Sequence, residues 1–280
     1  MFACSVSYPQ DPITLTRFIL KEQQEVRAAG GHVTGSFAML LQSIQLAVKV
    51  IANASTKAGI ANLYGVAGSE NKSGDQQKKL DVFSNDVFIN AIKFSEQVAP
   101  FTFLPLPSSP FTSAPCLPLQ VYVMCSEENE EAIVCDKNSG GYAVVFDPLD
   151  GSSNIDANVS VGTIFGIYAR DPTHGETSDR DLLKKGSKFI CGGYALYGSC
   201  VMLVLTTGRG VNGFSLDPSL GEFILTHKNI RIPLDGKQRP LPSAIHAMLC
   251  GTRVQTIRMA FFFLRLGSCR KNLLSQRGQL

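Results

Sequence analysis

The hydrophobic pattern of residues 1–94 predicts three helices. In each of them apolar side chains recur three or four residues apart, which is the spacing of one helix face. The stretch 36–57 shows this best, with a broad apolar face and a glycine just beyond its end. The predicted helices cover residues 13–28, 36–57 and about 78–94.

From residue 121 the pattern changes to short β-branched or aromatic runs separated by Gly, Asp and Pro, which is typical of strands. We expect strands at 121–125, 132–135, 142–146, 162–169, 199–207, 211–216 and 222–226. Helices followed by strands predict an α/β fold in which helix and sheet layers alternate, rather than a strict βαβ repeat.

One uncharged segment, residues 97–126, is long enough to span a membrane. It contains six prolines, and each proline inside a helix costs about 3 kcal/mol. We therefore expect no membrane span there and an irregular loop at 99–120.

Composition and charge narrow the function classes. The chain has 280 residues, of which 44% are hydrophobic and 18% charged, as in a globular protein of one large or two modest domains. Its net charge of +3 is uneven, because residues 238–280 hold seven basic and no acidic side chains. Residues 1–237 carry 19 basic and 23 acidic side chains, a net charge of −4. This acidic body predicts no nucleic-acid partner.

The cysteines and the N-terminal residues predict a cytoplasmic protein. The eight cysteines are scattered, with no C-x-x-C pair and no spacing typical of zinc ligands, so we expect reduced thiols. The first 18 residues lack a basic segment followed by an apolar core, so we expect no secretory signal.

The densest chemistry is the segment FDPLDGSSNID, residues 146–156. Asp147 and Asp150 follow an apolar strand and lie three residues apart in a turn stiffened by proline. Carboxylate oxygens suit Mg²⁺, and the Gly-Ser-Ser that follows offers N–H groups and hydroxyls to a phosphate. Taken alone, the motif fits an ordinary Asp-Gly turn about as well as it fits a site.

Two further acidic groups are weaker candidates. Glu127 and Glu128 follow the strand predicted at 121–125, where neighbouring carboxylates suit a metal or a proton acceptor. Taken alone, they fit a solvated charge run. Asp75 and Asp81 flank the start of the third predicted helix and, taken alone, fit surface positions.

Together these segments resemble the fructose-1,6-bisphosphatase family of sugar phosphatases, and its cytosolic plant and algal members most. The resemblance covers about 11–98 and 121–237, including KAGIANLYGVAGSENKSGDQQKKLDVFSND, SEEN, SVGTIFGIY and GGYALYGSCVMLVL. It implies Mg²⁺-dependent hydrolysis of the 1-phosphate of fructose 1,6-bisphosphate, a step of gluconeogenesis and sucrose synthesis. It also implies a homotetramer and two or three metal ions, with Mn²⁺ or Zn²⁺ as substitutes.

The resemblance also assigns roles to residues. The metal ligands would be Asp75, Glu127, Asp147, Asp150 and the main-chain carbonyl of Leu149. The attacking water would be activated by Asp81 and Glu128, and the 1-phosphate would be held by Asp150, Gly151, Ser152 and Ser153. Residues 59–79 would form a loop that closes over the site.

The nucleotide-inhibitor site of the family is matched in part. Thr34, Gly35 and Tyr142 match residues that bind AMP. Where the family has a Thr, a Lys and often an Arg, this chain has Ala38, Gly141 and Ala169. The loss of a cation and a hydroxyl predicts weak AMP binding.

Two segments depart from the family pattern, namely an insertion at 99–120 and the basic tail at 238–280. We therefore expect an N-terminal domain at 1–198 and the start of an incomplete C-terminal substrate domain at 199–237. The strands at 199–226 would then lack sheet partners, and the activity of this chain would be low.

Other interpretations remain open. The same architecture serves inositol monophosphatases and sedoheptulose bisphosphatases. The chain could instead be a non-catalytic subunit that binds metal or a full-length partner. A third alternative is that residues 252–274 form a basic amphipathic helix on a membrane surface.

Overall fold

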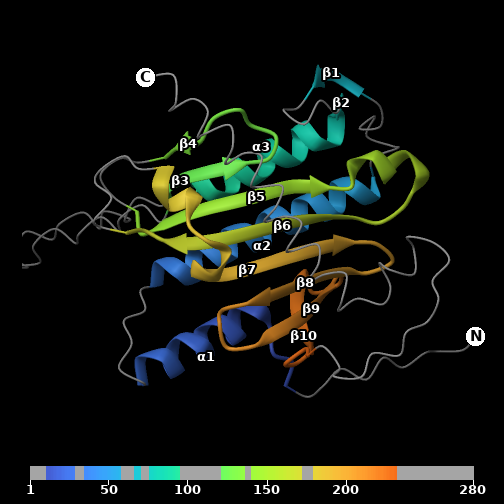
Figure 1. The fold of residues 1–280 in the computed structure, drawn as a ribbon. Coiled ribbons are helices and arrows are strands. Elements are labelled where there is room, and N and C mark those ends of the chain that lie inside the picture. Colours follow the sequence, from blue (N-terminus) through green and yellow to red (C-terminus); the bar gives the residue numbers. More distant parts are fainter. Residues whose placement is uncertain are drawn as a thin grey trace, which may run out of the picture.

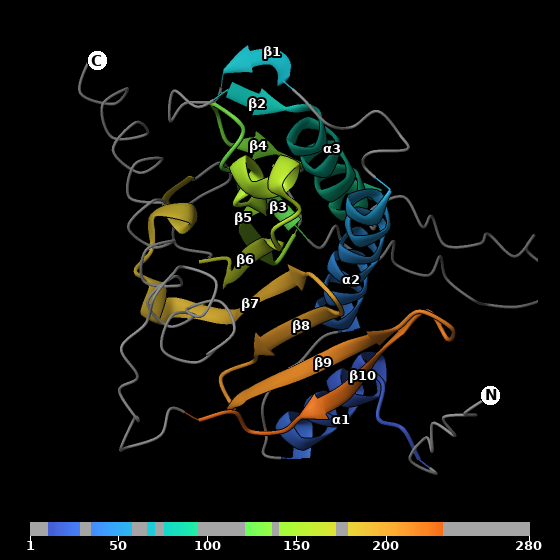
Figure 2. The same cartoon turned by 90° about the vertical axis from the view of Figure 1, so that its right-hand side faces the viewer.

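The computed structural model describes residues 11–28, 35–57, 66–70, 76–94, 121–135, 140–171 and 179–231. An eight-stranded mixed sheet runs through this part of the chain, and three α-helices cover one of its faces (Figures 1 and 2). The predicted α/β fold with helix and sheet layers is confirmed.

The three helices begin and end within two residues of the predicted bounds. They are α1 (Leu15–Ala28), α2 (Gly35–Thr56) and α3 (Lys79–Phe94). Short 3₁₀-helices connect parts of the sheet: η1 (Ser152–Ala157), η3 (Asp179–Leu183) and η4 (Gly186–Lys188).

The main sheet has the strand order β10-β9-β8-β7-β6-β5-β3-β4, in which β3 and β5 are parallel and all other neighbours are antiparallel. Its strands are β3 (Val121–Ser126), β4 (Ile133–Val134), β5 (Tyr142–Asp150), β6 (Val161–Ala169), β7 (Phe189–Tyr197), β8 (Val201–Thr206), β9 (Val211–Asp217) and β10 (Glu222–His227). All seven predicted strands are present.

The sequence pattern missed β7, which contains two consecutive glycines. Glycine usually weakens a strand, but here close packing requires it. A Cβ on Gly193 would lie 2.6 Å from the Phe165 ring and 2.8 Å from the Val204 carbonyl oxygen. The glycine therefore lets β7 fit between its neighbours rather than ending the strand.

Two expectations about the chain's organisation are wrong. The strands after residue 198 do not lack partners, because β8 pairs with β7 and β9 pairs with both β8 and β10. The outer edge of β10 is partly covered, since the Leu225 amide donates to the Ile13 carbonyl at 2.9 Å. Residues 59–79 are not wholly a loop, because β1 (Val66–Glu70) and β2 (Gln76–Lys78) form a two-stranded sheet.

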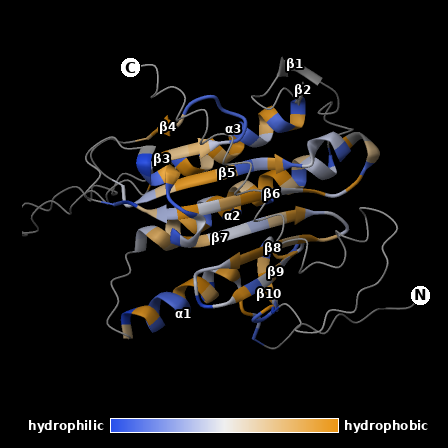
Figure 3. Ribbon diagram, viewed as in Figure 1, coloured by the Kyte–Doolittle hydropathy of each residue, from blue (hydrophilic) through white to orange (hydrophobic). Residues whose placement is uncertain are grey.

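The main core lies between the helices and the sheet. The Phe88 and Phe146 rings stack at 4.4 Å between α3 and β5, and Phe18 of α1 meets Phe214 of β9 edge-on at 5.3 Å. Figure 3 shows apolar residues along β3 and β5, whereas α1 alternates between polar and apolar positions. Within the described ranges, α2 alone is long and apolar enough to cross a membrane, and its apolar residues line this core.

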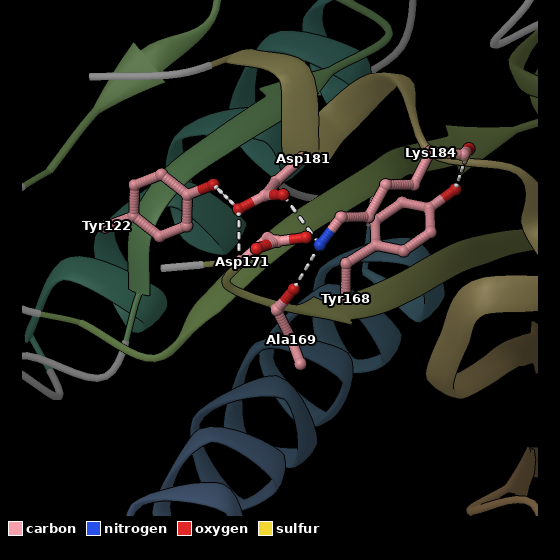
Figure 4. A network of polar contacts seen from close by, with 6 residues as sticks. All are labelled: Tyr122, Tyr168, Ala169, Asp171, Asp181 and Lys184. Atoms are coloured by element: carbon pink, nitrogen blue, oxygen red, sulfur yellow. Dashed lines mark hydrogen bonds and ion pairs between the residues drawn. The ribbon is translucent and has the colours of Figure 1, made fainter. Parts of the chain in front are cut away.

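A smaller cluster occupies the opposite face of the sheet, where Asp181 of η3 is fully buried. Its carboxylate accepts hydrogen bonds from the Tyr122 hydroxyl and from the Asp171 amide at 2.9 Å, and it pairs with the Lys184 ammonium at 2.6 Å (Figure 4). The Lys184 ammonium also donates to the Ala169 carbonyl at 2.8 Å. This paired charge attaches η3 to the sheet.

Several predicted features lie outside the described residues. These are the insertion at 99–120, the tail at 238–280 with the candidate helix at 252–274, and two single residues, Thr34 and Asp75. The domain boundary predicted at residue 199 falls between β7 and β8 of one continuous sheet and stays a prediction.

Candidate active site

The parallel pairing of β3 and β5 brings two of the predicted metal ligands together. Ser126 pairs with Phe146, and the Glu127 amide donates to the Phe146 carbonyl at 3.0 Å. Glu127 and Asp147 are the next residues along these two strands. They therefore lie side by side at the carboxyl ends of parallel strands, a common location for ligand sites in α/β sheets.

Asp147 is the electrostatic centre of this arrangement. Its side chain is 4% exposed, and burial raises the pKa of its carboxyl well above the usual value. The charges of Asp150, Glu127 and Glu128 raise the pKa further, and the Leu149 amide opposes the shift by donating to Oδ1 at 3.1 Å. Four acidic side chains thus share one small region.

Two buried hydroxyls, those of Thr163 and Tyr197, support the turn after Asp147 from the sheet. Thr163 of β6 donates to the Pro148 carbonyl at 2.7 Å, and its hydroxyl lies 2.6 Å from that of Tyr197 on β7. Thr163 is fully buried, and burial raises the pKa of Tyr197, so this hydroxyl stays neutral. The network fixes the main chain that presents the Leu149 carbonyl.

The chain then turns sharply at Gly151. Its φ of +83° lies in the left-handed region, which favours glycine over residues with a side chain. The Asn154 amide donates to the Gly151 carbonyl at 2.9 Å, and η1 follows. Ser153 is exposed and Ser152 half-buried at this turn.

The predicted water-activating residues come from two different elements. Asp81 lies in the first turn of α3 and is 2% exposed, whereas Glu128 lies in the half-buried turn after β3. Asn85 connects these elements, because its side chain accepts from the Ser126 hydroxyl at 2.7 Å and donates to Asn129 at 2.8 Å.

The sequence reasoning missed four supporting residues, namely Asn85, Ser126, Thr163 and Tyr197. Ser126 and Asn85 stand beside predicted site residues in the sequence, at one and four positions. Their proximity in the sequence to predicted site residues could have identified them. Thr163 and Tyr197 give no signal of this kind, because strand pairing alone brings Thr163 to the Pro148 carbonyl and Tyr197 to Thr163.

The donor set suits a hard divalent cation, since carboxylates and a main-chain carbonyl are preferred ligands of Mg²⁺. A cation would also offset the repulsion that raises the pKa of Asp147. Within the described ranges, no group of three or more His, Cys, Asp or Glu side chains is arranged to hold a metal ion. The residues therefore fit the cation in type and charge without completing a ligand set.

The predicted AMP residues lie near the opposite end of β5. Gly35 begins α2, and the Tyr142 ring at the start of β5 lies 5.8 Å from the ring of Phe37, two residues after Gly35. Tyr142 pairs across the sheet with Ala169, which is exposed. The structure thus brings Gly35, Tyr142 and two substituted positions, Gly141 and Ala169, into one neighbourhood.

Solved structures share this architecture, and curated proteins are similar in sequence. The holo form of fructose-1,6-bisphosphatase from Leishmania major matches with a TM-score of 0.65 and 39% identity, over 80% of this chain and 60% of that one. The cytosolic fructose-1,6-bisphosphatase of Arabidopsis thaliana is 50% identical over 227 residues, which are 81% of this chain and 58% of the relative. Isozyme 2 of Rattus norvegicus is 44% identical over 231 residues, or 82% and 60%.

The chain thus spans about 60% of the length of these relatives. The family model described as the N-terminal domain of fructose-1-6-bisphosphatase matches residues 13–102 and 113–228. The break between the two matched segments falls inside the predicted insertion. The resemblance seen in the acidic motifs is confirmed, and the chain belongs to the fructose-1,6-bisphosphatase family.

Proposed function

We propose that this chain carries the acidic centre of a phosphatase that hydrolyses the 1-phosphate of fructose 1,6-bisphosphate to give fructose 6-phosphate. The carrying observation is the parallel pairing that sets Glu127 beside Asp147. Family membership supports the reaction and a general dependence on a divalent metal ion. The relatives with this activity in their names are longer than the part that this chain matches.

Five groups would hold two or three Mg²⁺ ions in this proposal: Asp75, Glu127, Asp147, Asp150 and the Leu149 carbonyl. When bound, Mg²⁺ stabilises negative charge on the attacking and leaving oxygens of the phosphoryl group. The supporting observation is the buried Asp147 carboxyl, whose pKa is raised first by burial and then by three half-buried carboxylates around it, a combination that a bound cation would offset.

The remaining roles fall to residues around this centre. Asp81 and Glu128 would accept the proton of the attacking water, since carboxylates at two sides of one region can act as general bases. The turn from Asp150 to Ser153 would hold the 1-phosphate. The left-handed Gly151 and the exposed Ser153 support this role, because they leave hydrogen-bond donors at the surface of the turn.

Phosphate release from the purified chain tests the proposal. We expect slow release from fructose 1,6-bisphosphate with Mg²⁺, its loss in EDTA, and still less release from sedoheptulose 1,7-bisphosphate or inositol 1-phosphate. Asp147→Asn should abolish the release, and Glu131→Gln, at an exposed position of the neighbouring turn, should preserve it. Equal release from all three substrates would contradict the assignment.

A second candidate is a non-catalytic subunit that binds metal and joins a full-length partner. The observation that favours it is the coverage, because the chain matches about 60% of its relatives' length. Mn²⁺ binding without phosphate release, together with co-assembly with a full-length relative, would support this candidate over the first.

Regulation, assembly and location complete the proposal. We expect weak AMP binding at Thr34, Gly35 and Tyr142, measurable by calorimetry with Tyr142→Ala as the test variant. We also propose a homotetramer, to be tested by sedimentation. A cytoplasmic location is supported by relatives whose names call them cytosolic.

A further inference from the structure

A chain of three hydrogen bonds links α3 to the turn after β3. The Ser126 hydroxyl donates to Asn85 Oδ1 at 2.7 Å, and Asn85 Nδ2 donates to Asn129 Oδ1 at 2.8 Å. The Glu128 amide in turn donates to the Ser126 hydroxyl at 3.3 Å. One asparagine on the helix therefore contacts both ends of the turn that carries Glu127 and Glu128.

Asn85 lies on the face of α3 that packs against the sheet. It lies four residues after Asp81, and side chains at this spacing lie one above the other on one helix face. The next residue of interest on α3, Phe88, is fully buried and stacks on Phe146 of β5. The face of α3 that meets the sheet thus presents Asp81, Asn85 and Phe88 in order.

The link uses both the acceptor and the donor of the Asn85 amide. The Asn85 side chain accepts one hydrogen bond and donates another, a combination that carboxylates, alkyl groups and ammonium groups cannot provide. It also adds no charge to a region that already holds the four carboxylates of Asp147, Asp150, Glu127 and Glu128. Without such a link, repulsion between these carboxylates favours the turn moving away from β5.

We propose that Asn85 is a positioning residue that holds Glu127 and Glu128 in line with Asp81 and Asp147 for a divalent cation. The proposal rests on the metal site of the proposed function. Groups that orient metal ligands contribute about 10- to 100-fold to metal affinity or activity. Asn85 acts through the turn and does not itself touch the reacting atoms.

The test compares Asn85→Ala with Asn90→Ala, which removes the same side chain from an exposed position of the same helix. Hydrogen exchange of the amides of residues 127–129 is measured in EDTA, and Mn²⁺ affinity is measured by titration on the full chain. For Asn85→Ala we expect faster exchange at these amides and Mn²⁺ affinity lower by about tenfold or more. Asn90→Ala should match the unmodified chain in both.

A second pair of variants tests the same hydrogen bond in case Asn85→Ala does not fold. Asn129→Asp keeps the oxygen that accepts from Asn85, whereas Asn129→Leu removes it. We expect Asn129→Asp to retain Mn²⁺ affinity and slow exchange, and Asn129→Leu to lose both. This rescue is not expected if the side chain only fills space.

Three outcomes overturn the inference. They are unchanged exchange in Asn85→Ala, faster exchange with unchanged Mn²⁺ affinity, and equal behaviour of the two Asn129 variants. An unmodified chain that binds no Mn²⁺ overturns both this inference and the proposed metal site. A chain that binds Mn²⁺ in an Asn85-dependent manner yet releases no phosphate overturns the proposed activity alone.

Discussion

The two acidic turns of the candidate site are supported in different ways. The turn after β5 rests on buried groups, since Thr163 is fully buried and binds the Pro148 carbonyl from below. The turn after β3 has one buried hydroxyl, that of Ser126, but its connection to α3 runs through Asn85 and Asn129, which are both half-buried. One turn is therefore part of the sheet core, whereas the other is attached to the core by side chains at its rim.

This difference predicts that the turn after β5 is fixed and that the turn after β3 can adjust. Asp147 can stay at a fixed position even though its neighbours repel its charge, because the core holds its main chain. Glu127 and Glu128 can adjust, because hydrogen bonds at half-exposed positions open at low cost. Under the proposed function, a fixed ligand beside an adjustable one would suit a site that binds a cation and then releases product.

The largest expected effect comes from removing the support that both turns share. Phe88→Ala deletes a fully buried ring that stacks on Phe146, and such a change costs about 3–5 kcal/mol. We expect a matching loss in the free energy of unfolding, measured with denaturant, and loss of Mn²⁺ binding. Val82→Ala, at a partly exposed position of α3, should cost less than 1.5 kcal/mol. Equal losses would show that α3 does not anchor the turns.

Asp147→Asn separates fold stability from metal binding. Asparagine keeps the oxygen that accepts from the Leu149 amide and removes the charge that Asp150 and Glu127 repel. Because the folded-state pKa of Asp147 is raised, the chain in EDTA loses stability as the pH rises through that value. The variant should lack this loss and be more stable in EDTA near neutral pH.

The same variant should bind Mn²⁺ at least about 100-fold more weakly, since even groups that only orient a ligand contribute 10- to 100-fold. Glu131→Gln, which removes a charge from an exposed position, is the control. A lower stability of Asp147→Asn in EDTA would contradict the electrostatic account of the turn after β5.

The sequence predicted the acidic residues of both turns but not the difference between their supports. Asp147, Asp150, Glu127 and Glu128 stand in short segments at strand ends, where local spacing already indicates chemistry. Their convergence depends on β3 and β5 being parallel neighbours, a long-range pairing that hydrophobic periodicity does not encode. The family resemblance provided this information in place of the pattern.

The fold shows the same limit at β7. Its glycines indicate a turn when read locally, whereas Gly193 is required because Phe165 and Val204 approach it closely. Thr163 is a similar case, because its partner is the Pro148 carbonyl on a neighbouring strand. Residues whose role depends on a neighbouring strand could not be recognised from their own segment.

Thr163→Val tests the buried support of the turn after β5. It keeps the shape of the side chain but leaves the Pro148 carbonyl without this hydrogen bond, which costs about 1–3 kcal/mol when the group is buried. Thermal unfolding should show this loss. Thr16→Val, at a half-buried position of α1 where the hydroxyl makes no hydrogen bond within the described residues, should change stability by about 0.5 kcal/mol or less. Similar effects at both positions would show that the turn is not supported from the core.

The smallest expected effect is the coupling between Asn85 and Asn129 in the turn after β3. A double-mutant cycle with Asn85→Ala and Asn129→Ala isolates their hydrogen bond. We expect a coupling of about 0.5–1.5 kcal/mol in the free energy of unfolding, below the cost of Thr163→Val, because both residues are half-buried and water replaces the lost partner. A coupling that exceeds the Thr163 effect would reverse the comparison. The turn after β3 would then be the fixed one, and the adjustable ligand would have to be sought in the turn after β5.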